Sequence, residues 1–150
     1  MLRVYPPPHF WILHIDGSAK PNPGRMAMGL VLTAPDGAAF SHGQSLPGTG
    51  CNNEAELRAL LAGLMLAHSH GARSLRIYTD SRWLVEQLSP STVAGVVVRP
   101  TRRLLPWLDR VQPLLQGLDN VQWRWVPRHL NTQADGLARQ AMADAAELLK

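Results

Sequence analysis

The sequence predicts a single α/β domain built on a mixed β-sheet, and three observations support this. Strand-like segments fill the first third of the chain, a helical pattern begins at Asn52, and strands and helices then alternate to the end. The predicted order is β-β-β-α-β-α-α-β-α. A chain of 150 residues suits one globular domain. We predict one domain over 1–150, in which the proline-rich stretch 1–9 is an extended N-terminal arm.

The first three segments predict an antiparallel meander. The run FWILHIDGS (10–18) is typical of a buried strand that delivers Asp16 at its end. Residues 25–37 predict a second strand closed by the turn signal PDG, and residues 38–48 return as a third.

The pattern changes at Asn52, where a helix is predicted. Asn52 or Asn53 can cap it and Gly71 can end it. Its apolar stripe consists of Leu57, Leu60, Leu61, Leu64 and Met65. The remaining elements are a strand over 75–80, a helix over 81–88 with Ser81 as N-cap, a helix over 102–118 that Pro106 and Pro113 kink or split, a strand over 121–127, and a helix from about Asn131 to the end. Residues 89–101 give no clear pattern.

Composition narrows the class of protein. A net charge of +4 and a pI near 10 favour a polyanionic partner without establishing one. No apolar stretch approaches the ~20 residues of a membrane-spanning helix. One cysteine and no recognisable export signal lead us to expect a cytoplasmic protein without disulfides.

Four acids fall where a site is expected. Asp16 and Asp80 end two strands, and Glu56 and Asp135 lie in the first turns of two helices. Partly buried carboxylates repel one another unless a cation lies between them. Oxygen ligands without a Cys or His cluster suit Mg²⁺ or Mn²⁺, and such clusters serve two-metal phosphoryl transfer. Each acid alone is also compatible with a turn, a helix cap or a solvated helix position.

The segments IDGSAKPNPG, CNNEAEL, YTDSRWLVEQL and WRWVPRHLNTQADGLAR together resemble ribonuclease H type 1, in the same order. The resemblance spans roughly 10–143. It implies a ribonuclease H-like fold with a five-stranded mixed sheet, three strands antiparallel and then two parallel, flanked by helices. It also implies a monomeric endoribonuclease that cuts the RNA strand of RNA/DNA hybrids with two Mg²⁺ or Mn²⁺ ions and leaves 5′-phosphate and 3′-hydroxyl ends.

The same resemblance implies roles for single residues. Asp16 bridges the two ions, Glu56 and Asp80 complete one shell, and Asp135 serves the other. His129 is a candidate for assisting product release or proton transfer, with Arg128 as its competitor and a solvated loop residue as the alternative. The expected substrate contacts are Gly17, Ser18, Asn22, Cys51, Asn52, Asn53, Arg82 and Arg128.

The chain departs from the family pattern in several places. Cys51 stands where the family usually has Thr, and a thiol is a weak donor, so we expect a weaker grip on the DNA strand. Arg82 stands where better-known bacterial members have Gln, and it is either an RNA-phosphate contact or a solvated residue. The basic helical protrusion of many members is missing from 89–101, for which Arg99, Arg102 and Arg103 compensate only in part.

Aromatic and histidine residues near these motifs favour structural roles. We expect Trp83, Trp123 and Trp125 to pack rather than stack on bases, and His14 to be a satisfied histidine in the core or just below the surface. Two other functions are disfavoured by the sequence. The DGS and NNEAE segments argue against another nuclease of the same fold, such as a Holliday-junction resolvase or an exonuclease, and the retention of all four acids argues against an inactive hybrid-binding module.

Overall fold

The computed structural model describes residues 9–89 and 102–148. Two sequence predictions therefore lie outside the described residues: the N-terminal arm, except for its last residue, and the segment around Arg99. Its five strands are β1 (Trp11–Lys20), β2 (Gly24–Thr33), β3 (Ala39–Gly50), β4 (Ser74–Thr79) and β5 (Asn120–Trp125). Its α-helices are α1 (Asn52–Ser69), α2 (Arg82–Leu88), α3 (Leu105–Gln116) and α4 (Thr132–Leu148), with short 3₁₀ turns over Arg102–Leu104 and Arg128–Leu130. None of the helices in the described part of the chain is long and apolar enough to cross a membrane.

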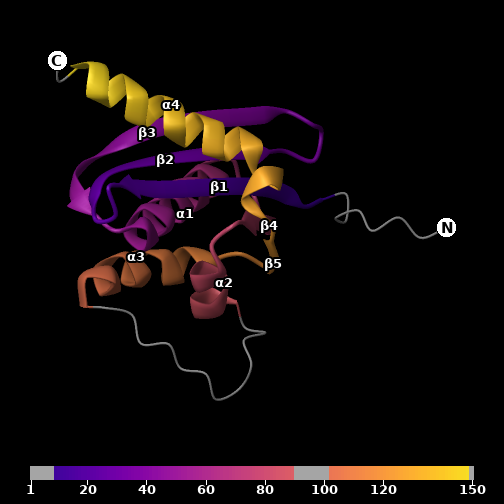
Figure 1. The fold of residues 1–150 in the computed structure, drawn as a ribbon. Coiled ribbons are helices and arrows are strands. Elements are labelled where there is room, and N and C mark those ends of the chain that lie inside the picture. The colour runs from indigo at the N-terminus through magenta and orange to yellow at the C-terminus, as the bar shows by residue number, and fades with distance from the viewer. Residues whose placement is uncertain (1–8, 90–101, 149–150) are drawn as a thin grey trace.

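The strands form one sheet in the order β3-β2-β1-β4-β5 (Figure 1). β1 pairs with β2, and β2 with β3, in antiparallel fashion, whereas β4 pairs in parallel with both β1 and β5. The predicted mixed sheet, its strand directions and the element order are therefore confirmed.

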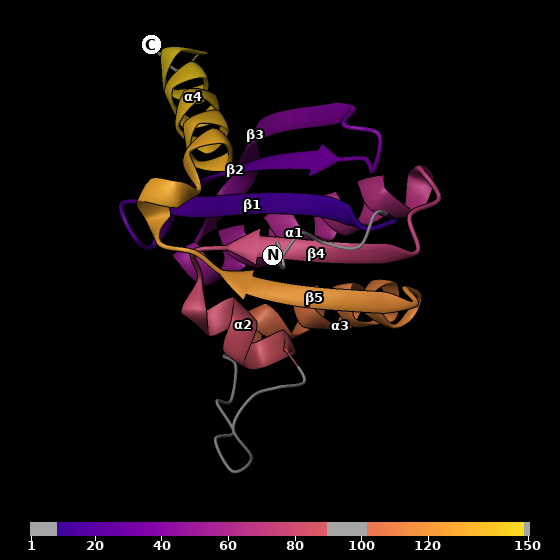
Figure 2. The ribbon, with the colours of Figure 1, turned by 90° about the vertical axis from the view of Figure 1, so that its right-hand side faces the viewer.

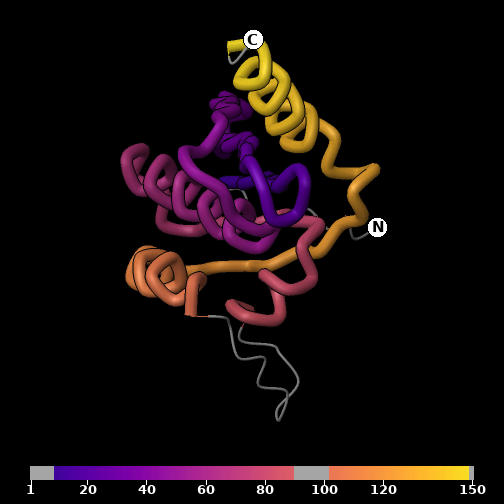
Figure 3. The backbone as a smooth tube through the Cα atoms, turned by 60° about the vertical axis from the view of Figure 1, so that its left-hand side comes forward, coloured from indigo at the N-terminus to yellow at the C-terminus, as the bar shows by residue number. Residues whose placement is uncertain are grey.

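Helices cover the two faces of the sheet. α1 packs chiefly on β1, with α3 beside it, while α4 lies across β2 and β3 on the opposite face, as the two turned views show (Figures 2 and 3). Buried leucines of α1 form the core with the inward residues of β1, β2 and β4. Of the predicted α1 stripe, Leu57, Leu60, Leu61 and Leu64 are buried. Met65 is 53% exposed, so its assignment to the stripe is wrong.

Several predicted boundaries are wrong for local reasons. β1 continues past Asp16 to Lys20, because Gly17, Ser18 and Ala19 go on pairing with β2 instead of turning away. The second strand ends at Thr33, and the turn predicted at Pro35, Asp36 and Gly37 follows it, closed by a hydrogen bond from the Gly37 N–H to the Ala34 carbonyl.

The helical boundaries differ in two further places. Neither Asn52 nor Asn53 caps α1; the thiol of Cys51 does, accepting the Glu54 N–H at 3.4 Å. Residues 105–116 form one helix that contains both prolines, because Pro106 lies in the first turn, where its missing N–H costs no bond. Of the kink or split predicted at the prolines, the split does not occur. Gly71 follows the end of α1 with a φ of +76°, as the sequence predicts.

Glycines allow α1 to approach β1 closely and α4 to approach β2 closely. A Cβ on Gly17 would collide with the Ala55 and Glu56 backbone of α1. A Cβ on Gly29, which pairs with Asp16, would collide with the Ala134 carbonyl of α4. These contacts bring the first turns of α1 and α4 against the same part of the sheet, at Gly17 of β1 and Gly29 of β2.

We expect Gly29→Ala to lower the free energy of unfolding by about 1–3 kcal/mol, because the new methyl group forces α4 away from β2. Urea unfolding measures this directly. Gly136→Ala is the matched control within α4, since nothing lies within 4 Å of its new Cβ, and it is expected to stabilise the protein by about 0.5–1 kcal/mol. Equal effects of the two changes would contradict the close-packing account.

Candidate active site

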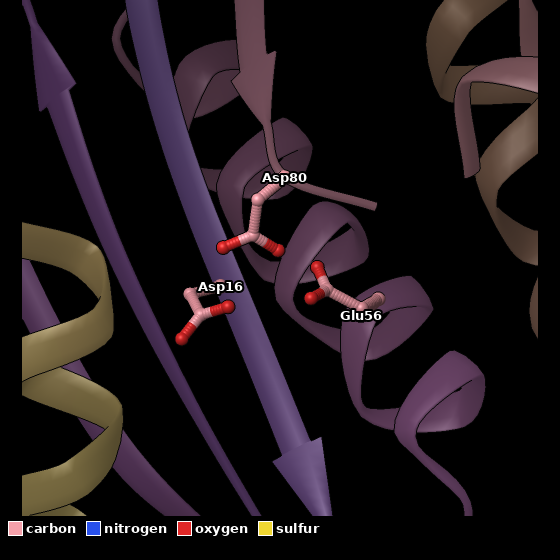
Figure 4. Close-up of side chains that lie close together, drawn as sticks. All are labelled: Asp16, Glu56 and Asp80. Carbon is pink, nitrogen blue, oxygen red and sulfur yellow. The ribbon is translucent and has the colours of Figure 1, made fainter. Parts of the chain in front are cut away.

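Three of the four predicted acids form a compact cluster. Asp16 projects from the middle of β1, Glu56 from the first turns of α1, and Asp80 follows the last residue of β4 (Figure 4). One carboxylate oxygen from each lies within 4.8 Å of the other two. Asp16 and Glu56 are buried and Asp80 is half-buried. The sequence placed these acids together correctly, although Asp16 reaches the site from within its strand.

Asp135 lies in the first turn of α4. Its carboxylate interacts with that of Asp16, but it is not part of the compact group of three. Arg139, one turn along α4, holds it through an Nε–Oδ2 ion pair of 2.9 Å. Asp16 therefore interacts with all three of the other acids.

Burial and mutual repulsion raise the pKa values of the three clustered acids. Desolvation, followed by the charges of Asp80 and Asp135, raises the pKa of Asp16 to about 7. Burial and the charge of Asp16 raise the pKa of Glu56 well above its ordinary value, against the hydrogen bond that the Gly17 backbone gives to Glu56. Burial also raises the pKa of Asp80, while Arg128 and the Asn131 side chain oppose that rise.

The residues fit a hard divalent cation. Oε2 of Glu56 and Oδ2 of Asp80 are buried without a hydrogen-bond partner, although they face other carboxylates. Carboxylate oxygens left unpaired in such a group are the ligands that Mg²⁺ and Mn²⁺ take in proteins. A cation among these oxygens would remove both the repulsion and the desolvation cost that raise the pKa values.

The cluster opens into a hollow of about 180 Å³. Besides the four acids, its lining consists of Gly17, Ser18, Lys20, Asn52, Asn53, Ser81, Arg128 and Arg139. Of the predicted substrate contacts, Gly17, Ser18, Asn52, Asn53 and Arg128 are thus brought together, whereas Asn22, Cys51 and Arg82 do not line this hollow. His129 is exposed and does not line the hollow, whereas Arg128 does.

Two of the predicted contacts have structural partners. Asn22 Oδ1 accepts the backbone N–H of Asn52 at 3.0 Å, and Asn52 Oδ1 accepts that of Ala19 at 2.7 Å. These bonds tie the β1–β2 turn to the start of α1. The glycine requirement at position 17 also comes from α1, whose backbone fills the space of a Cβ, rather than from a ligand.

Sequence reasoning missed several residues around the cluster. Asn131, 1% exposed, donates its Nδ2 to the Ile15 carbonyl at 2.7 Å and lies beside Asp80. Buried Glu54 is paired with Arg103 at 2.8 Å and with Arg58 at 3.6 Å. The Asn in the NTQAD segment is a sequence signal for Asn131. The Glu54–Arg58 pair lies within α1 at a spacing of four residues, whereas the Glu54–Arg103 pair joins residues 49 positions apart and leaves no local sequence signal.

Of the predictions for the aromatic residues and His14, all but the one for Trp125 agree with the structure. Trp123 is half-buried and packs against the core, and His14 stacks on Tyr78 with ring centroids 4.6 Å apart, as expected. Trp83 is also half-buried against the core. Trp125 is 41% exposed, so the prediction that it packs in the core is wrong.

Known proteins agree with this geometry. Residues 14–141 match the family model described as reverse transcriptase-like. Ribonuclease HI of Halobacterium salinarum is 33% identical over 132 residues, which cover 88% of this chain and 64% of that protein. The chain spans only 36% of the length of a bifunctional protein of Mycobacterium tuberculosis that it also matches.

Solved structures extend the comparison. The N-terminal RNase H domain of that Mycobacterium tuberculosis protein superposes with a TM-score of 0.82 at 33% identity, covering 94% of this chain and 99% of that one. LC11-RNase H1, solved in complex with an RNA/DNA hybrid, gives a TM-score of 0.78 at 25% identity, covering 91% and 99%.

In the absence of bound cations, we expect Asp16→Asn to stabilise the protein increasingly as the pH rises. A raised native pKa means that the folded state binds more protons than the unfolded state, so the wild type loses stability from about pH 4 to about pH 7. The advantage of the variant should grow by on the order of 2 kcal/mol between pH 5 and pH 8. Urea unfolding of both proteins in the presence of a chelator measures the difference in their free energies of unfolding. A difference that does not change with pH would contradict the raised pKa of Asp16 as its cause.

The order of the strands, the acids gathered around Asp16 and the matches above lead to one conclusion: the chain belongs to the ribonuclease H type 1 family.

Proposed function

We propose that this chain is a metal-dependent endoribonuclease that hydrolyses the RNA strand of RNA/DNA hybrids and leaves 5′-phosphate and 3′-hydroxyl ends. The observation that carries the proposal is the compact, partly unpaired cluster of Asp16, Glu56 and Asp80. Membership of the ribonuclease H family supports the substrate class, as does the hybrid bound to LC11-RNase H1.

In this proposal the acids divide between two Mg²⁺ or Mn²⁺ ions. Asp16 would bridge them, because its carboxylate interacts with those of Asp80, Asp135 and Glu56. Glu56 and Asp80 would complete the first set of ligands, and Asp135 would belong to the second. When bound, the ions activate water for attack on the phosphate and stabilise the leaving oxygen.

The remaining residues of the hollow bind and orient the nucleic acid. Lys20, Arg128 and Arg139 surround the carboxylates with cationic groups that suit phosphates. We propose that the backbone at Gly17 and Ser18, with the side chains of Asn52 and Asn53, faces the strands, and that Asn22 supports Asn52. Arg82 would reach RNA phosphates next to the site. We assign no more than a peripheral role to His129.

Cleavage assays test the proposal. With Mg²⁺ or Mn²⁺, we expect cutting of the RNA strand in an end-labelled RNA/DNA hybrid, and none of DNA/DNA. Asp80→Asn should lower kcat at least 100-fold because it removes a ligand charge. Asp119→Asn, the same change at an exposed residue paired with Arg73, should retain activity.

The failures of this assay are informative. An unaltered protein that binds the hybrid but does not cut it would establish the inactive-module alternative. Full activity in Asp80→Asn would overturn the metal-site assignment while leaving the enzyme class intact.

A second prediction concerns Cys51 and the binding of the DNA strand. Its thiol caps α1 with a 3.4 Å bond, and the nearby Arg103 donates to Glu54 and to the Thr49 carbonyl. A hydroxyl is a stronger donor and cap than a thiol. We therefore expect Cys51→Thr to lower KM for the hybrid about two- to fivefold with kcat unchanged, measured by steady-state kinetics. Cys51→Ala is the control, and an equal fall in its KM would contradict a role for the hydroxyl.

A further inference from the structure

The indole of Trp125 forms a hydrogen bond to the backbone of Asp80, one of the acids of the active site. β4 and β5 pair up to Thr79 and Trp125, and the Val126 N–H donates to the Thr79 carbonyl at 2.9 Å. Asp80 is the next residue, beyond the last paired position. Its carbonyl oxygen accepts a hydrogen bond from Nε1 of Trp125 at 3.1 Å. A side chain thus supplies the bond that joins β5 to the residue carrying a site carboxylate.

Arg82 holds the indole from outside. Its guanidinium carbon lies 4.3 Å from the centre of the Trp125 ring, within the range of a cation–π interaction. Arg82 begins α2, two residues after Asp80. Trp125, although 41% exposed, therefore contacts both Asp80 and Arg82.

The other bonds of this turn leave the Asp80 carbonyl to Trp125. The Ser81 N–H donates to Thr79 Oγ1 at 3.0 Å, and Ser81 Oγ caps α2 by accepting the Leu84 N–H at 3.1 Å. These bonds fix the backbone on either side of Asp80. The hydrogen bond from Trp125 Nε1 to the Asp80 carbonyl is therefore the contact that restrains this turn from β5.

We propose that Trp125 is a positioning residue for the metal site, which acts by anchoring the Asp80 carbonyl and so keeps the carboxylate turned toward Asp16 and Glu56. Arg82 stabilises this arrangement through its contact with the ring. The inference rests on the proposed function for the role of Asp80 as a ligand, but its structural part, the restraint on the turn, is independent of it.

Trp125→Phe tests the anchor because it removes the N–H donor and keeps a ring beneath Arg82. We expect Mn²⁺ binding, measured by isothermal titration calorimetry on the full chain, to weaken about three- to tenfold. The kcat on hybrid should fall by a similar factor, while KM changes less than twofold. Trp123→Phe, on the same strand but packed against the core, is the matched control and should leave Mn²⁺ affinity within twofold.

Amide hydrogen exchange without metal separates this inference from the proposed function. Trp125→Phe should speed exchange of the Ser81 and Val126 amides at least fivefold, and Trp123→Phe should not. Unchanged exchange, or equal Mn²⁺ affinity in the two variants, would overturn the anchor. Wild-type protein that fails to bind Mn²⁺ would overturn the proposed function instead, and the exchange rates would still decide the structural part.

Discussion

The mutual repulsion of buried carboxylates around Asp16 is the constraint on which the rest of the structure depends. Asp16 and Glu56 are almost fully buried, and neither has a basic side chain among the causes of its shifted pKa. Such a group is costly to bury unless it binds a cation. The fold supports it from both faces of the sheet, because Gly17 admits α1 and Gly29 admits α4.

Some of the charged residues near the cluster form ion pairs within the fold, whereas others line the hollow. Glu54, only two residues before Glu56, is neutralised by Arg103 and Arg58, so it takes no part in the cluster. Arg128 lines the hollow beside Asp80, and Arg139 holds Asp135. A buried negative centre with a basic rim suits a substrate that brings its own phosphates and a cation that joins them to the protein.

Much of the fold followed from local sequence signals, and the rest depended on tertiary contacts. Hydrophobic periodicity and turn residues predicted the element order, and the motifs placed Glu56, Asp80 and Asp135 near Asp16. Periodicity cannot reveal that strand pairing carries β1 past Asp16, because Gly29 and its neighbours impose it from β2. Nor can it reveal the Arg103–Glu54 pair or the Trp125–Asp80 bond, whose partners are 49 and 45 residues apart.

The most direct test of the account is the location of a bound ion. Anomalous diffraction from crystals of the protein grown or soaked with Mn²⁺ would identify the metal by its own signal. The account predicts a peak among the carboxylates of Asp16, Glu56 and Asp80. A fully ordered cluster without any peak there, or a peak confined to other acids on the surface, would contradict it.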